Sequence, residues 1–191
     1  MNNLAPEGYR LGINTGFAVN RYVEPEEWLR IVGEELGVTN IQFTADMLNV
    51  DLPVHILLKQ TERIRMACEK YGVEVSSTFT GAFTRVNHLA HPDQDLREHW
   101  VKWFKRFVDL SVELGCESMG SHFGIFSSKD NSDIERRDKR LKQNIENWHR
   151  IGEYAKEKGL SYLTWEPMSI SREQGETLEE ARLLQTKVNQ G

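Results

Sequence analysis

A recurring pattern, in which a helical segment ends on a glycine and a strand-like run follows, limits the folds open to this chain. The pattern occurs four times, with glycines at positions 37, 72, 115 and 159. A glycine directly after a helix can take the left-handed conformation that closes the last turn, and the apolar or β-branched run behind it is typical of a strand. Its recurrence along the chain favours repeated strand–helix units and a parallel sheet over a sandwich or a helical bundle.

These runs predict five strands, over residues 11–19, 40–48, 73–80, 116–123 and 160–166. The segments between them carry apolar residues at helical spacing. We interpret Trp100, Trp103, Phe104 and Phe107 in one such segment as core residues rather than as a cofactor site.

Two prolines and one capping motif predict where helices begin. Pro25 and Pro53 occupy positions suited to a first helical turn. Thr177 and Glu180 form a capping box, which predicts a last helix that ends near Asn189.

The count of five strand–helix units leaves two architectures open. Closing a (β/α) barrel takes eight units and typically ~250 residues. With 191 residues the chain is expected to form one α/β domain over residues 1–191. That domain is either a complete, open doubly wound sheet or an incomplete TIM barrel with five of its eight units.

Composition restricts the partners and the compartment. A formal net charge of −5 argues against a nucleic-acid partner held by phosphate contacts. No stretch is apolar enough to suggest a signal peptide or a membrane span, so no membrane partner and a cytoplasmic location are expected. Cys68 and Cys116 lack metal-binding spacing, and we expect both to be reduced core thiols.

Glu166 is the first candidate for a site residue. It follows an apolar run and precedes Pro167, which disfavours a helical conformation for the residue before it. Glu166 is therefore expected to be extended at the end of a strand. In α/β proteins, ligands bind in the crevice at the carboxyl ends of parallel strands.

Other strand ends also carry polar residues, among them Asn14, Thr44, Thr78, Ser121 and His122. Together they match what a (β/α) active site requires. The alternative, that polarity simply returns where a strand ends, stays open for Asn14, Thr44 and Thr78.

His122 stands between Gly120 and Gly124, which permit close approach of a ligand to the backbone. Such a histidine can bind a metal, hydrogen-bond a hydroxyl group or move a proton, and the alternative is a histidine satisfied within the core.

The long loop over residues 81–95 is expected to cover substrate, through Arg85, Asn87, His88 and His91. Pro92 disfavours the helix that would align His88 and His91 on a metal, so we interpret them as loop or substrate-contact residues.

Arg172 has the forked shape that suits a phosphate or a carboxylate, although pairing with Glu173 or Glu176 is an equal alternative. The basic run over residues 136–140 is interleaved with acidic residues and is expected to be a solvated helix face.

Two motifs resemble those of the xylose isomerase-like TIM barrels: Trp165-Glu166-Pro167-Met168 followed by Arg172, and Ser121-His122-Phe123-Gly124. The segment over residues 87–93 is similar to the branch of sugar phosphate isomerases and epimerases, including enzymes of four-carbon ketose phosphates. The resemblance runs over essentially the whole chain, and it implies the first five units of a barrel.

The resemblance also implies a divalent metal, Mn²⁺, Mg²⁺, Co²⁺ or Zn²⁺, held by a glutamate at the end of the fifth strand and by residues of strands six to eight. It makes Glu166 the metal ligand and a catalytic base, and it makes His122 a catalytic residue that orients a substrate oxygen. Arg172 would anchor a phosphate, with His88, Asn14 and Thr44 as further substrate contacts. The implied reaction is proton transfer at a carbon beside a carbonyl of a sugar or sugar phosphate.

Two alternatives remain from the sequence. A metal-dependent nuclease of the endonuclease IV type would need several histidines at strand ends, and only His122 is so placed. A barrel fragment with little or no activity would bind sugar or associate with itself as a homo-oligomer, because an open sheet exposes an edge.

Overall fold

The computed structural model describes residues 9–81, 88–168 and 170–190, which form a parallel sheet flanked by helices. The sheet order is β1-β2-β3-β4-β5, and each strand pairs in parallel with the next. The strands are β1 (Gly12–Asn14), β2 (Asn40–Thr44), β3 (Glu74–Phe79), β4 (Ser118–Ser121) and β5 (Tyr162–Trp165). This order confirms the predicted α/β class with successive (β/α) units.

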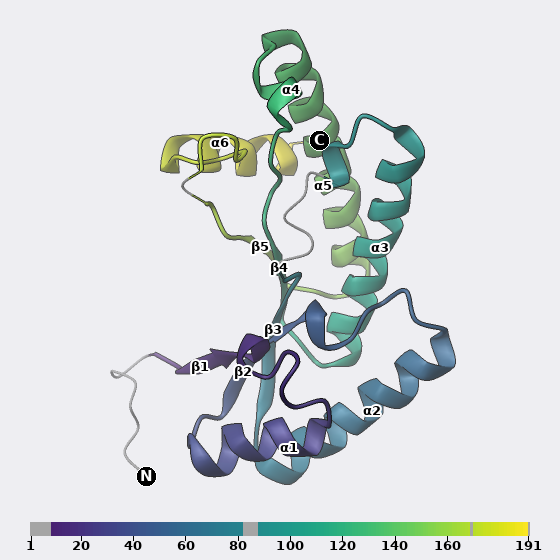
Figure 1. Cartoon of the computed structure of the whole chain (residues 1–191), viewed down its shortest axis with the longest axis vertical. Helices are drawn as coiled ribbons and strands as arrows, with labels where there is room; N and C mark the ends of the chain where they lie inside the picture. Colours follow the sequence, from purple (N-terminus) through teal and green to yellow (C-terminus); the bar gives the residue numbers. More distant parts are fainter. Residues whose placement is uncertain (1–8, 82–87, 169, 191) are drawn as a thin grey trace.

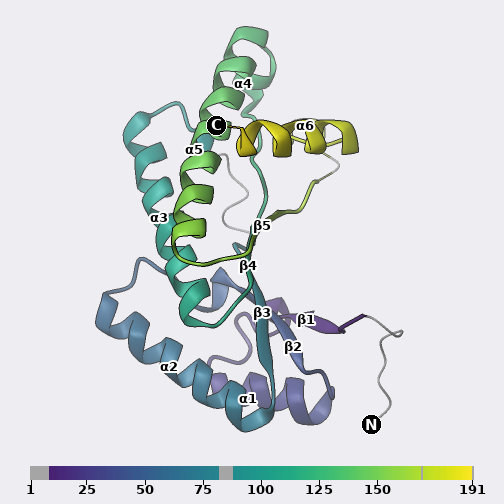
Figure 2. The ribbon, with the colours of Figure 1, turned by 180° about the vertical axis from the view of Figure 1, so that it is seen from behind.

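The helices follow the strands in alternation. They are α1 (Pro25–Arg30), α2 (Val54–Tyr71), α3 (Gln94–Glu113), the short α4 (Ser128–Asn131), α5 (Ile134–Glu157) and α6 (Leu178–Asn189). Figures 1 and 2 show α3 and α5 side by side along one side of the strands, with α1 and α2 paired at the other end of the sheet. Helix α6 packs on α5 and lies across β5 from α3 (Figure 1).

The predicted helix ends are confirmed. Gly37, Gly72, Gly115 and Gly159 all have positive φ angles, between 63° and 90°. Thr177 caps α6 by accepting a hydrogen bond from the backbone N–H of Glu180. Pro25 is the first residue of α1, as predicted. Pro53 was also expected within a first helical turn, but it is the N-cap of α2, which begins at Val54.

The strands are shorter than predicted. Both β1 and β2 end in a 3₁₀ turn, Thr15–Phe17 after β1 and Ala45–Met47 after β2. Asn14 starts the first turn, because its side chain accepts a hydrogen bond from Gly16 N at 2.7 Å. The residues after Asn14 and Thr44 were predicted to continue the strands, but they form these turns instead. Residues 31–35 continue α1 as a wider π-type turn.

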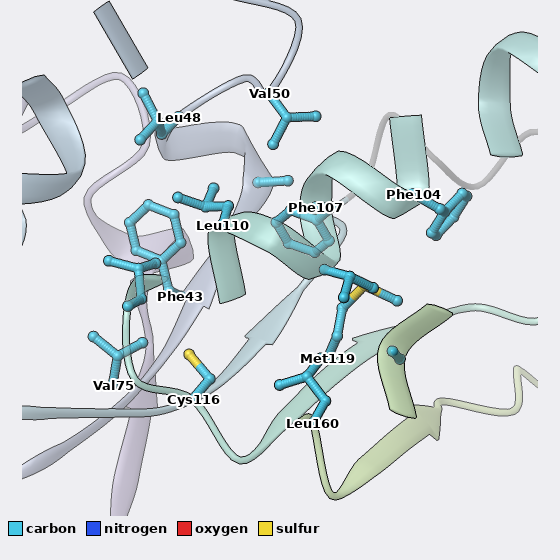
Figure 3. Close-up of a cluster of buried hydrophobic side chains, with 14 of the residues drawn as sticks. Phe43, Leu48, Val50, Val75, Phe104, Phe107, Leu110, Cys116, Met119 and Leu160 are labelled. Atoms are coloured by element: carbon cyan, nitrogen blue, oxygen red, sulfur yellow. The ribbon is translucent and has the colours of Figure 1, made fainter. Parts of the chain in front are cut away.

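The core lies between the sheet and the helices. Phe43 of β2 and Met119 of β4 meet Phe107 and Leu110 of α3 there (Figure 3). Cys116 is buried and Cys68 half-buried, and neither forms a disulfide. Burial raises the pKa of both thiols to about 12, as expected of inert core cysteines.

Aromatic packing joins α3, α5 and β5. Trp148 of α5 is fully buried, with its ring centroid 5.1 Å from that of Phe104 and 5.7 Å from that of Trp165. Trp103, Phe104 and Phe107 are buried, which confirms them as core residues, whereas Trp100 is half-buried and packs against this core.

The basic run at the start of α5 is not uniformly solvated, so that prediction was partly wrong. Asp130 of α4 is fully buried, 2.6 Å from an Nη of Arg136 and 3.5 Å from Nε of the buried Arg140. A buried carboxylate needs charged partners, and two members of the run supply them.

We expect Asp130 to make stability depend on acid pH. Burial opposes its charged form, but hydrogen bonds from Ser127 and Arg136 outweigh burial and hold the pKa of Asp130 below its ordinary value of 3.8. This stabilisation is complete above the unfolded pKa and is lost as the pH falls through the lower, folded pKa. Urea unfolding between pH 7 and pH 3 should therefore show a steeper acid loss in the native protein than in Asp130→Asn. Equal slopes would contradict the prediction.

Candidate functional site

The carboxyl ends of β4 and β5 bring His122 and Glu166 together. Along a strand, alternate residues share a face, so His122 lies on the face of Gly120 and Glu166 on that of Thr164. Gly120 and Thr164 are paired in register. A side chain at Gly120 would meet Phe79 at 2.6 Å and Thr164 at 2.9 Å, so glycine is required where these strands pass.

A pair of hydrogen bonds fixes the two strand ends to each other. The Glu166 N–H donates to the Ser121 carbonyl at 3.1 Å, and Nδ1 of His122 lies 3.3 Å from the Glu166 carbonyl oxygen. His122 is 6% exposed, and its ring stands edge-on to that of Phe79, with centroids 5.3 Å apart. Glu166 itself is exposed. A buried histidine thus lies against the backbone of an exposed glutamate at the carboxyl ends of β4 and β5, where the site was predicted.

The loops after β4 and β5 are joined by a short antiparallel contact between Ile125 and Glu173. Phe126 N donates to the Arg172 carbonyl at 2.8 Å, and Gln174 N donates to the Gly124 carbonyl at 2.8 Å. These bonds hold the loop that carries Arg172 against the loop that begins at His122.

Arg172 uses one arm of its guanidinium within this contact. Its Nη1 donates to the Phe126 carbonyl at 2.7 Å. Neither Glu173 nor Glu176 forms an ion pair with Arg172 among the described residues. The guanidinium is half-buried, and its role in phosphate binding stays a prediction.

Asn14 and Thr44 occur at the ends of β1 and β2, where they were predicted. Asn14 Nδ2 donates to Gln42 Oε1 at 2.8 Å, and Gln42 Nε2 donates to Ser77 at 3.4 Å, which forms a polar row across three strands. Thr44 is buried, and its hydroxyl donates to Asp46 at 2.9 Å. Substrate contact by Asn14 and Thr44 therefore stays a prediction.

The sequence analysis did not identify Gln42, which joins Asn14 to Ser77 in this polar row. The available signal was alternation, because Gln42 is a polar residue between two apolar ones in a short strand.

His88 stacks on Trp100 at the side of α3, with ring centroids 3.8 Å apart. His91 accepts a hydrogen bond from Asp93 N at 3.0 Å. Arg85 and Asn87, which were also predicted to contact substrate, lie outside the described residues. Within residues 9–81, 88–168 and 170–190, no three His, Cys, Asp or Glu side chains gather as a metal site.

This architecture defines a (β/α) protein whose candidate site residues lie at the carboxyl ends of the strands. The sequence profile of the xylose isomerase-like TIM barrels matches residues 32–190, and the chain belongs to that family.

Three similar proteins give this assignment detail. The chain is 39% identical over 178 residues to D-erythrulose 1-phosphate 3-epimerase of Brucella abortus (strain 2308), covering 93% of this chain and 57% of the relative. A candidate xylose isomerase from Rhodospirillum rubrum has a TM-score of 0.86 at 28% identity, covering 95% of this chain and 62% of that one. A xylose isomerase-like TIM barrel protein from Mycobacterium smegmatis, solved with magnesium, has a TM-score of 0.65 at 18% identity. That match covers 95% of this chain and 62% of the Mycobacterium protein.

The chain thus spans about three fifths of the length of the relatives that it matches. Its five strands correspond to a partial barrel. Among the described helices none combines the length and the apolar character that crossing a bilayer requires.

Proposed function

We propose that this chain contributes the fifth-strand part of the active site of a metal-dependent sugar phosphate 3-epimerase that acts on a short ketose phosphate. The observation that carries the proposal is the juxtaposition of His122 with Glu166 at the carboxyl ends of β4 and β5. The relative from Brucella, whose name states 3-epimerisation of D-erythrulose 1-phosphate, supports this substrate class.

The proposed reaction removes the proton from C3, the carbon beside the C2 carbonyl. Glu166 takes this proton, and the electron pair of the C–H bond moves toward the carbonyl oxygen as an enediolate forms. His122, held against the Glu166 backbone, hydrogen-bonds a substrate oxygen. Arg172 pairs with the phosphate through the part of its guanidinium that does not contact Phe126. Return of a proton to the opposite face of C3 completes the epimerisation, whereas return from Glu166 to the same face regenerates the substrate.

Family members often use divalent metal ions, and Glu166 is the residue here that fits such a role. It is an exposed carboxylate at a strand end, a suitable oxygen donor for magnesium or manganese. When bound, the ion would polarise the ketose carbonyl and lower the barrier to proton removal. The described residues supply no group of three donors, so this proposal assigns only Glu166 as a ligand.

Proton exchange in D₂O tests the proposal directly. Exchange at C3 needs one base, whereas inversion needs a second proton donor on the opposite face. We expect the 191-residue chain, with Mn²⁺ and D-erythrulose 1-phosphate, to replace the C3 proton by deuterium, which NMR detects as loss of the C3 proton signal. No exchange above that of buffer and metal alone, from a folded protein, would refute the proposal for this chain.

Self-association remains a second candidate because β5 is an edge strand of the sheet. Helix α5, β5 and α6 border a groove of about 890 Å³, where Tyr162 is 64% exposed and Leu178 61% exposed. Light scattering coupled to size exclusion would separate a monomer from an associating chain.

A further inference from the structure

Two buried asparagines on α5 donate hydrogen bonds to loops at the carboxyl-end face of the sheet. Asn144 is fully buried and Asn147 is 5% exposed. They lie three residues apart and therefore close together on the helix surface. A buried amide is costly unless it is hydrogen-bonded, and the Nδ2 group of each of these residues donates to specific partners.

Asn144 joins the loops after β4 and β5. Its Nδ2 donates to the Phe123 carbonyl at 2.8 Å and to Gln174 Oε1 at 2.7 Å. Trp148 Nε1 donates to the same Phe123 carbonyl at 2.8 Å. That carbonyl directly follows His122, and Gln174 lies two residues after Arg172. One side chain thus ties together the segments that carry both of these site residues.

The loop after β4 passes close to the Asn144 amide. Gly124 has a φ of +156°, and a Cβ built there would lie 2.6 Å from Asn144 Nδ2. Glycine at this position lets the loop backbone approach the amide closely.

Asn147 makes the equivalent contact with a third segment. Its Nδ2 donates to the Leu89 carbonyl at 2.7 Å, next to His88 in the turn His88–Ala90. Its Oδ1 accepts from Arg150 at 3.1 Å. Both Nδ2 and Oδ1 of Asn147 are therefore hydrogen-bonded, and among the described residues Asn147 forms no hydrogen bond with the loops held by Asn144.

We infer that Asn144 and Asn147 are positioning residues of α5. Asn144 holds the loops after β4 and β5, and Asn147 independently holds the turn His88–Ala90. Asn144 orients His122 and Arg172, and Asn147 orients His88. The inference deepens the proposed function, on which it rests for the roles of these three residues. The physical basis of this inference is that a strand end fixes where a loop begins, whereas contacts beyond the sheet, such as those of Asn144 and Asn147, fix the course of the loop.

Ring ¹⁵N NMR of the histidines tests this without any need for turnover. Asn144→Leu and Asn147→Leu are matched variants, because each removes one buried amide from the same helix. We expect Asn144→Leu to shift the ring signals of His122 and leave those of His88 in place, and Asn147→Leu to do the reverse. Asn144→Ala and Asn147→Ala, which add no volume, serve if a leucine variant does not fold.

Two outcomes would overturn the inference. Shifts of both histidines in both variants would mean that each substitution loosens the whole region, and shifts of neither would mean that the asparagines do not affect the histidines. Deuterium exchange at C3 is measured in parallel. If the crossed pattern appears while the native chain shows no exchange, the positioning role stands and the proposed reaction fails.

Discussion

Replacing Glu166 by glutamine is expected to reduce C3 deuterium exchange by about 10²–10⁴-fold, the usual contribution of a positioned general base. Glutamine keeps the size and the backbone contact with Ser121, but it cannot take up the proton. The exchange rate, followed by NMR with D-erythrulose 1-phosphate and Mn²⁺, measures this effect. Calorimetric titration with Mn²⁺ tests the ligand role separately, and we expect weaker binding in Glu166→Gln.

Glu157→Gln is the matched control. Glu157 is also exposed, but it ends α5 and precedes β5, so it lies toward the amino end of this strand, whereas Glu166 follows its carboxyl end. Its exchange rate should equal that of the native chain. A Glu166→Gln rate within twofold of native would show that another group removes the proton.

Replacing Trp148 by alanine is expected to lower the free energy of unfolding by about 3–5 kcal/mol, as for other large aromatic residues deleted from a core. The fully buried ring packs between Phe104, Phe123 and Trp165, so its removal leaves a cavity where α3, α5 and β5 meet. The change also removes one donor to the Phe123 carbonyl. Urea unfolding followed by circular dichroism gives the difference.

Tyr162→Ala provides the comparison for Trp148→Ala. Tyr162 is a large aromatic residue of β5, but it is 64% exposed, and its loss should cost less than about 1 kcal/mol. A similar loss of unfolding free energy in the two variants would mean that the packing of Trp148 does not stabilise the core between α3, α5 and β5.

Much of the fold followed from local signals. The four glycines after helices, the N-cap at Thr177 and the buried Trp103, Phe104 and Phe107 of α3 took their predicted states. Strand ends were less predictable. Hydrophobicity continues past Asn14 and Thr44, but the chain turns there because hydrogen bonds to Asn14 and Thr15 compete with further pairing.

For the site, sequence reasoning identified residues but not their partners. Glu166 and His122 were recognised from Pro167 and the flanking glycines, whereas the bond from His122 to the Glu166 backbone depends on the pairing of β4 with β5. Arg172 was expected to face a phosphate or a glutamate, yet it also donates to the carbonyl of Phe126, 46 residues away along the chain.

The sequence by itself determined the order of helices and strands and the polar residues at the strand ends, because periodicity, glycine conformation and proline restriction act within a few residues. The family followed from the match of the sequence to the xylose isomerase-like TIM barrels. Only the tertiary structure decided that Asn144 and Asn147 contact three separate loops and that Asp130 is buried with Arg136 and Arg140. An asparagine or an arginine on a helix has the same local propensity whether it faces water or a distant carbonyl. Its partner is fixed by burial against segments far away in the chain, and no local pattern encodes that.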